Sequence, residues 1–109
     1  MLKKIKKILY RSLDTKEISY KKLQEIISKN KEAILLDVRS KQEFREGHLE
    51  GAINIPVYDI EKQLNQLSDK KCTIIIYCAS GHRSRQAKEK LEQMGYESVY
   101  HLKNGLDGI

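Results

Sequence analysis

The sequence has no long hydrophobic run. No apolar stretch in its 109 residues approaches the roughly 18 residues needed to span a bilayer. The start, MLKKIKKILYRSL, interrupts its apolar residues with lysines and lacks the continuous apolar block and small-residue cleavage site of a secretory signal. We therefore expect a cytoplasmic protein. The length corresponds to a single domain with a small hydrophobic core.

Cysteine is scarce as well, with only Cys72 and Cys78 in the chain. Both belong to the segment CTIIIYC, whose β-branched residues predict a buried strand. An extended chain of this length separates the two Cα atoms by roughly 20 Å, whereas a disulfide needs less than about 7 Å. The two cysteines are therefore expected to stay unpaired within one chain, and neither a metal site nor a cofactor is predicted.

Positive charge is concentrated at one end of the chain. The formal net charge is +6, and residues 1–22 account for all of it, with eight Lys or Arg against two acidic residues. Residues 23–109 hold thirteen residues of each sign. A nucleic-acid-binding face spread over the whole domain is therefore not expected.

The basic segment 1–13 has three open interpretations. Leu2, Ile5, Leu9 and Leu13 share one helical face with lysines opposite, which is typical of a solvated amphipathic helix packed on the domain, and we favour this one. The same pattern also suits weak contact with an anionic membrane surface or with an acidic partner.

Strand patterns alternate with helical patterns along the rest of the chain. Such alternation predicts an α/β fold with a central parallel sheet and helices on both faces. In these sheets ligands gather at the carboxyl ends of the strands, where the pattern places Asp37 and Cys78. The expected strands are 33–38, 51–56, 72–77 and 98–102, and the expected helices are 20–29, 40–47, 59–67 and 83–95.

Local signals suggest several element boundaries. Ser19 and Ser40 are suitable N-caps for the helices that follow them. Asp14 with Glu17 forms a capping box or simply marks a turn. Residues 103–109 are expected to be a loop or tail.

The stretch CASGHR places a cysteine between a strand and the start of a helix. N–H groups at a helix start lack internal partners, and the helix dipole adds partial positive charge there. Gly81 permits a backbone conformation that directs successive N–H groups at one point, and His82, Arg83 and Arg85 add positive character. These surroundings favour a reactive Cys78 thiolate, with donors nearby to hold a substrate anion.

A buried, unreactive cysteine is the plainer alternative, because cysteine is among the residue types most often buried. We favour that alternative for Cys72, which lies early in the strand. For Cys78, the joint occurrence of a strand end, a basic Gly-containing loop and a helix start favours a nucleophile.

Loop length then indicates what the loop holds. Four residues, Ala79 to His82, separate Cys78 from Arg83. Tyrosine-specific and dual-specificity phosphatases place five residues there, and rhodanese sulfurtransferases typically have a loop one residue shorter. The smaller cradle favours a sulfur atom over a tetrahedral phosphate.

Two motifs make the chain resemble a single-domain rhodanese over about residues 17–109, which we take as the domain, with residues 1–16 as a separate basic segment. The stretch LLDVRSKQEFREGHLEGAINIP is similar to the family's long N-terminal motif, and IIIYCASGHRSRQAKEKLEQMGY to its active-site motif. The stretch VYHLKNG resembles the family's last strand and turn, although Asn104 stands where the family often has a glycine. The resemblance implies a rhodanese-like α/β fold.

The resemblance also implies the activity of a thiosulfate sulfurtransferase. Cys78 would attack a sulfane sulfur donor, either thiosulfate or a related persulfide or polysulfide, and a thiol or cyanide acceptor would then take the outer sulfur from the Cys78 persulfide. Backbone N–H groups of residues 79–83 would hold the anionic persulfide. Arg83 would bind an anionic donor or brace the loop, and Ser84 would cap the helix. The predicted cradle comprises Ala79, Ser80, Gly81, His82, Arg83 and Ser84.

The remaining motif residues are expected to be structural. Asp37 would accept hydrogen bonds from the active-site loop, and Arg39 would pair with Glu43 across a short helix. His48, which precedes a turn, is expected to be a structural histidine. His82 would tune substrate choice or would simply be exposed.

Two other functions remain open. One is a non-catalytic rhodanese-fold module for binding or regulation, which an intact Cys78 and its loop disfavour. The other is a cysteine-dependent phosphatase or arsenate reductase, which the four-residue loop disfavours.

Overall fold

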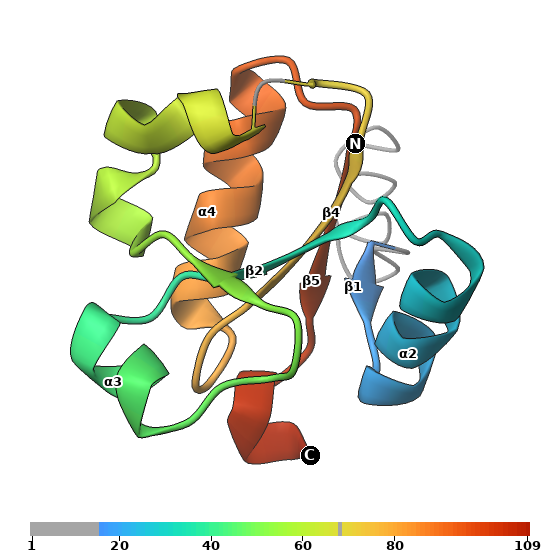
Figure 1. The fold of residues 1–109 in the computed structure, drawn as a ribbon, viewed down its shortest axis with the longest axis vertical. Coiled ribbons are helices and arrows are strands. Elements are labelled where there is room, and N and C mark those ends of the chain that lie inside the picture. The colour runs from blue at the N-terminus through green and yellow to red at the C-terminus, as the bar shows by residue number, and fades with distance from the viewer. Residues whose placement is uncertain (1–15, 68) are drawn as a thin grey trace, which may run out of the picture.

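A computed structural model, which describes residues 16–67 and 69–109, contains one five-stranded sheet with helices on both faces (Figure 1). All strand pairs are parallel, in the order β1-β5-β4-β2-β3. The predicted α/β fold is therefore confirmed. The strands are β1 (Glu17–Ile18), β2 (Ile34–Asp37), β3 (Ile53–Asn54), β4 (Thr73–Tyr77) and β5 (Ser98–Leu102).

Helices and short 3₁₀ segments connect the strands and cover the sheet. In Figure 1, α4 and the η1–η2 region lie on one side of the sheet, and α2 lies on the other. Within the ranges that the structure describes, no helix is long and apolar enough to cross a membrane. The bounds are α2 (Tyr20–Lys29), α3 (Lys41–Glu46), η1 (Val57–Asp59), η2 (Glu61–Leu67), α4 (His82–Gln93) and η3 (Gly105–Gly108).

The central strand β4 determines which face Cys78 occupies. Successive side chains of a strand point to opposite faces of its sheet. Ile74, Ile76 and Cys78 accordingly join the apolar cluster under α4, whereas Ile75 and Tyr77 join the cluster on the α2 side. The continuous apolar run of β4 reflects burial on both faces, and the alternation directs the Cys78 side chain toward α4.

The predicted caps of two helices are confirmed. The Ser19 hydroxyl accepts a hydrogen bond from the Lys22 N–H at 3.1 Å at the start of α2. Ser40 and Glu43 form a reciprocal capping box at the start of α3, with both bonds at 3.1 Å. The same Glu43 side chain is therefore fixed in position before it contacts any other part of the protein.

Two predicted elements differ in extent or type. The strand predicted at 51–56 shrinks to the two residues of β3. The helix predicted at 59–67 is a pair of 3₁₀ segments with a kink at Gln63. Connectors often tighten into 3₁₀ turns, and this one places Ile60 and Leu67 in the core, each 0% exposed.

The first strand was not predicted. Glu17 lies in β1, which pairs with β5 so that Glu17 is opposite His101. The capping-box role suggested for Glu17 is therefore wrong, while Asp14 and the basic segment 1–13 lie outside the described residues. A strand of two residues is too short to give a periodic signal.

The tail predicted at 103–109 is instead a 3₁₀ turn packed on the Cys78 loop. The Leu106 N–H donates to the Cys78 carbonyl and the Asp107 N–H to the Ala79 carbonyl, both at 2.9 Å. Asn104 takes a left-handed conformation (φ 61°), which asparagine tolerates better than most residues. The turn therefore supplies the hydrogen bonds that the first two carbonyls of the loop need.

The close packing of η3 predicts that Gly105→Ala destabilises the protein strongly. A Cβ at Gly105 would lie 2.4 Å from the Cys78 carbonyl oxygen, and φ is +58°. Overpacking and left-handed strain together predict a loss of about 3 kcal/mol in the free energy of unfolding, measured by urea denaturation. The control is Gly51→Ala, where φ is +83° but no atom lies within 4 Å. It should lose only about 1 kcal/mol, and equal losses would contradict the packing argument.

Candidate active site

The Cys78 sulfur lies at the carboxyl end of β4 and faces the start of α4. It accepts hydrogen bonds from the Gly81 N–H at 3.1 Å and the Ser84 N–H at 3.3 Å. The residue is 0% exposed. Hydrogen bonds from backbone N–H groups stabilise a thiolate better than a thiol, and two such donors converge on this sulfur.

The tight loop around Cys78 depends on Gly81. Its φ is +104°, and a Cβ there would lie 3.3 Å from the Asn104 backbone nitrogen. Because L-residues with side chains rarely adopt this conformation, glycine is needed both for the backbone angle and for the approach of the following turn. Of the N–H groups of residues 79–83 that were predicted to hold the sulfur, only that of Gly81 donates to it, and the second donor is the Ser84 N–H. Ser80 and His82 are exposed, and Ala79 is half-buried.

Ser84 has a different role from the one predicted. It is the third residue of α4, which has no side-chain N-cap, so the capping role is wrong. Ser84 is 0% exposed, and its hydroxyl donates a hydrogen bond to the Gly81 carbonyl at 3.1 Å. The same hydroxyl lies 3.6 Å from the Cys78 sulfur and 3.2 Å from Nδ1 of His101. Ser84 therefore contacts the sulfur with both its backbone and its side chain.

Arg83 is held by Glu43 from α3. The guanidinium makes two hydrogen bonds to the carboxylate, at 2.7 and 3.0 Å. The Arg83 hydrogen bonds lower the pKa of Glu43 to about 2, and Glu43 in turn raises the pKa of Arg83. The predicted pairing of Glu43 with Arg39 is therefore wrong. This ion pair fastens the first turn of α4 to α3, which agrees with the bracing role suggested for Arg83.

Asp37 and Arg39 form a separate, buried pair at the end of β2. The Asp37 carboxylate, 0% exposed, accepts from the Arg39 guanidinium at 2.7–3.1 Å and from its backbone N–H at 2.9 Å. Arg39 also donates to the Gly47 carbonyl at 2.6 Å and lies over the Tyr77 ring. The expectation that Asp37 accepts hydrogen bonds from the Cys78 loop is wrong, because Arg39, two residues along, folds back over the carboxylate.

His48, predicted to be a structural histidine, is exposed and contacts Phe44. Its ring stacks on Phe44 with centroids 3.7 Å apart, and Nδ1 lies 2.8 Å from the Phe44 carbonyl oxygen. Cys72, predicted to be buried, is half-buried; it packs against the core, and burial raises the pKa of its thiol. Both cysteines are free.

Sequence reasoning missed two residues, His101 and Glu17. His101 is 2% exposed, and its Nε2 lies 3.0 Å from Oε2 of Glu17. Arg85 contacts the same carboxylate at 2.6 Å. A signal for His101 was present, because strand alternation in SVYHL puts it on the same buried face as Val99, and a buried polar side chain requires a partner. No comparable signal pointed to Glu17.

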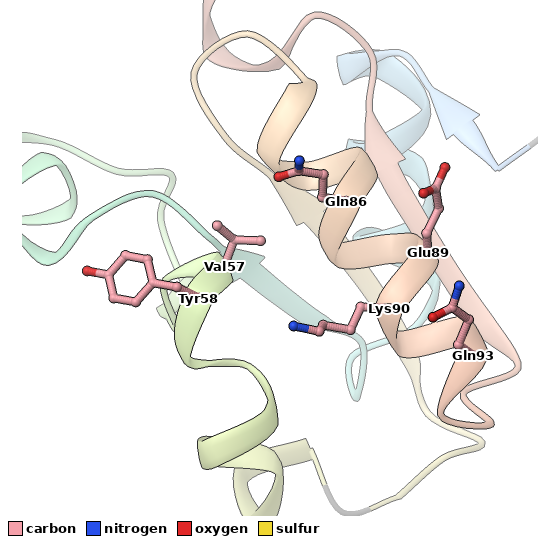
Figure 2. Close-up of a pocket in the computed structure, with 6 residues that line it drawn as sticks. All are labelled: Val57, Tyr58, Gln86, Glu89, Lys90 and Gln93. Carbon is pink, nitrogen blue, oxygen red and sulfur yellow. The ribbon is translucent and has the colours of Figure 1, made fainter.

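An open groove of about 420 Å³ lies between η1 and α4 (Figure 2). Val57 and Tyr58 line it from η1, opposite side chains of α4. None of its lining residues belongs to the Cys78 loop, so the groove is separate from the sulfur site. Among the described residues, no group of three or more His, Cys, Asp or Glu side chains is arranged to hold a metal ion.

Comparison with known proteins agrees with this geometry. The family model for the "Rhodanese-like domain" matches residues 19–109. A sulfurtransferase of Allochromatium vinosum is 31% identical over 90 residues, which cover 83% of each protein. The thiosulfate sulfurtransferase PspE of Escherichia coli K12 is 40% identical over 65 residues, covering 59% of this chain and 62% of PspE.

Comparison with a solved structure gives the same fold. The human single-domain sulfurtransferase TSTD1 superposes with a TM-score of 0.74 at 25% identity, covering 84% of this chain and 91% of TSTD1. Some curated relatives are much longer, and the chain spans only 26% of a tRNA uridine(34) hydroxylase from Buchnera aphidicola. Because the family model matches residues 19–109, and the relatives and the solved structure agree with it, the chain belongs to the rhodanese-like domain family.

Proposed function

We propose that this protein is a sulfurtransferase that carries sulfur as a persulfide on Cys78. The observation behind the proposal is the pair of backbone N–H groups, from Gly81 and Ser84, directed at the Cys78 sulfur. Relatives named as sulfurtransferases support sulfur transfer in general. Thiosulfate as the donor, and a thiol or cyanide as the acceptor, are the finer parts of the proposal.

The proposed reaction has two displacement steps. The Cys78 thiolate attacks the outer sulfur of thiosulfate, a new S–S bond forms, the S–S bond of thiosulfate breaks, and sulfite leaves with the electron pair. An acceptor thiolate then attacks the outer sulfur of the Cys78 persulfide and leaves as a new persulfide, which regenerates the Cys78 thiolate. Backbone N–H donors favour the anionic sulfur in both steps.

Arg83 is proposed to brace the loop rather than to bind the donor. Its guanidinium already makes two hydrogen bonds to Glu43, so a donor anion would have to compete with a carboxylate. Holding Arg83 fixes the first turn of α4, from which the Ser84 N–H reaches the sulfur at 3.3 Å. A fixed donor loses less entropy when charge develops on the sulfur.

A non-catalytic binding module is the second candidate, and the burial of Cys78 favours it. The residue is 0% exposed, so its sulfur is not open to a donor in this conformation. A cysteine-dependent phosphatase or arsenate reductase is the third candidate. Hydrolysis of an aryl phosphate at rates comparable to sulfur transfer would favour that third candidate.

A reducing location such as the cytoplasm is part of the proposal, because it would keep the Cys78 thiol available for the reaction. The acceptor would then be a low-molecular-weight or protein thiol, which such a compartment supplies.

Mixing the protein with thiosulfate is predicted to add the mass of one sulfur atom, because Cys78 is converted to a persulfide. Intact-protein mass spectrometry measures the shift. Polysulfide and a low-molecular-weight persulfide serve as alternative donors. Cys78→Ser is expected to abolish the shift with every donor, and Cys72→Ser is expected to leave it unchanged. If no donor shifts the mass of the wild-type protein, the sulfurtransferase proposal fails and the binding module takes its place.

Glu43→Gln is predicted to lower the free energy of unfolding at pH 7 by about 1 kcal/mol, since Arg83 and Glu43 are 36% and 34% exposed and solvent screens the pair. The pKa of Glu43 is lowered from 4.5 to about 2. The ion pair therefore contributes fully above pH 4.5, and its contribution disappears as the pH falls toward 2. Urea denaturation over this pH range measures the difference between wild type and variant.

Glutamine keeps one oxygen for the capping box with Ser40, so Glu43→Gln removes the charge and one of the two acceptors for Arg83 but not the cap. Glu25→Gln is the matched control, because Glu25 pairs with Lys22 at 3.8 Å on an exposed face of α2. It should change the unfolding free energy by less than about 0.5 kcal/mol. A difference for Glu43→Gln that persists unchanged at pH 2 would contradict the ion-pair explanation.

A further inference from the structure

A line of contacts runs from the Cys78 sulfur away from the loop and into the sheet. The sulfur lies 3.6 Å from the Ser84 hydroxyl, which lies 3.2 Å from Nδ1 of His101. Nε2 of His101 lies 3.0 Å from a carboxylate oxygen of Glu17 in β1. Cys78 and Ser84 are 0% exposed and His101 is 2% exposed. The two displacement steps proposed above use neither His101 nor Glu17.

The Glu17 carboxylate determines which ring nitrogen of His101 carries the proton. Burial by itself would raise the pKa of Glu17, but the hydrogen bond from Arg85 and the neighbouring His101 bring it below its ordinary value. An ionised carboxylate only accepts hydrogen bonds, so Nε2 of His101 must be the donor. In the neutral ring Nδ1 is then an acceptor, and it faces Ser84.

The Ser84 hydroxyl has one proton for three neighbours: the Cys78 sulfur, Nδ1 of His101 and the Gly81 carbonyl. When His101 is neutral, the hydroxyl donates to Nδ1 or to the carbonyl and accepts from the Cys78 thiol. When His101 is protonated, Nδ1 donates to the hydroxyl, whose own proton is then available to the Cys78 thiolate. The protonation state of His101 therefore decides whether Ser84 accepts from the sulfur or donates to it.

We propose that His101 is a positioning residue that acts through Ser84: it takes up the proton of the Cys78 thiol and makes the Ser84 hydroxyl a third hydrogen-bond donor to the thiolate. The thiol proton moves to the Ser84 oxygen while the Ser84 proton moves to Nδ1 of His101. No electrons are transferred, and the result is a thiolate and an imidazolium joined by one hydroxyl. This inference rests on the proposed role of Cys78 as nucleophile.

Charged groups on two elements face His101. Burial lowers the pKa of His101, Glu17 in β1 opposes that effect, and Arg85 and Lys88 in α4 add to it. His101 is therefore neutral at neutral pH when Cys78 carries its thiol proton. The proposal requires the imidazolium to form together with the thiolate, as a coupled pair.

The test measures the alkylation rate of Cys78 by iodoacetamide as a function of pH, in a Cys72→Ser background. The wild-type pair is expected to give two titration steps, one for formation of the thiolate beside imidazolium and one for loss of the His101 proton. His101→Asn keeps a polar group near Ser84 that does not titrate. It should give a single step and lower the rate at about pH 6 by about tenfold, because the thiolate has lost its partner.

Three further variants distinguish the relay, which is the proton transfer from Cys78 through Ser84 to His101, from a merely structural role of His101. If His101 acts through Ser84, then Ser84→Ala alone removes the second step, and adding His101→Asn to Ser84→Ala lowers the rate by less than about twofold. Glu17→Gln should keep both steps and shift the His101 step to lower pH, since the carboxylate that favours the imidazolium is gone. Two steps retained in His101→Asn, or a tenfold effect of His101→Asn in the Ser84→Ala background, would overturn the proposal.

A direct measurement on the folded wild type complements the variants. The ¹⁵N shifts of the His101 ring should show the Nε2–H tautomer whenever the ring is neutral, and the His101 pKa should fall when Cys78 is replaced in Cys78→Ala, since coupling is reciprocal. An Nδ1–H tautomer would overturn the proposal even if the variants fail to fold. None of these measurements uses a sulfur donor. If the alkylation rate of the wild type shows a single titration step while the persulfide still forms, the role of His101 is refuted and sulfur transfer stands. If the alkylation rate shows two steps but no persulfide forms, sulfur transfer is refuted and the role of His101 stands.

Discussion

The position of β4 at the centre of the parallel sheet is the constraint on which the rest of the structure depends. β4 is hydrogen-bonded to β2 on one side and to β5 on the other, and its residues from Ile74 onward are buried. A chain that leaves such a strand must turn sharply over one face to begin the next helix. Here that turn brings the N–H groups of Gly81 and Ser84 within 3.1 and 3.3 Å of the Cys78 sulfur. The pairing of β4 with its neighbours thus positions the Cys78 sulfur without any contribution from charged side chains.

Charged pairs around the sulfur have distinct physical roles. Asp37 and Arg39 are buried, so their mutual hydrogen bonds offset the desolvation of both charges and make the pair a fixed part of the β2 end. Arg83 and Glu43 are half-exposed, so their pair contributes mainly by restricting the start of α4. Glu17, by contrast, orients a buried ring rather than a loop. These ion pairs contribute mainly by holding the residues that they join in fixed positions, and less by their net electrostatic attraction.

The sequence predicted the elements whose signals are local. Strand β4 follows from its β-branched run, and α3 from a Ser and a Glu at capping-box spacing. Partner choice among charges could not be predicted, because the helical spacing offered Arg39 as the partner of Glu43, whereas Glu43 bonds to Arg83, 40 residues away. The roles of Ser84 and η3 were missed for the same reason. Both depend on β4, α4 and β5 being brought together, which no local pattern encodes.

The hydrogen bonds from η3 to the Cys78 loop limit how such a loop can change in size. The carbonyls of Cys78 and Ala79 are tied to Leu106 and Asp107, and Gly81 fits closely against the backbone of Asn104. An inserted residue that widened the cradle toward the dimensions of a phosphate would therefore have to enter near the exposed Ser80, and the chain's C-terminal turn would have to move with it. A cradle one residue larger would accordingly need both the inserted loop residue and a repositioned turn some 25 residues farther along the chain.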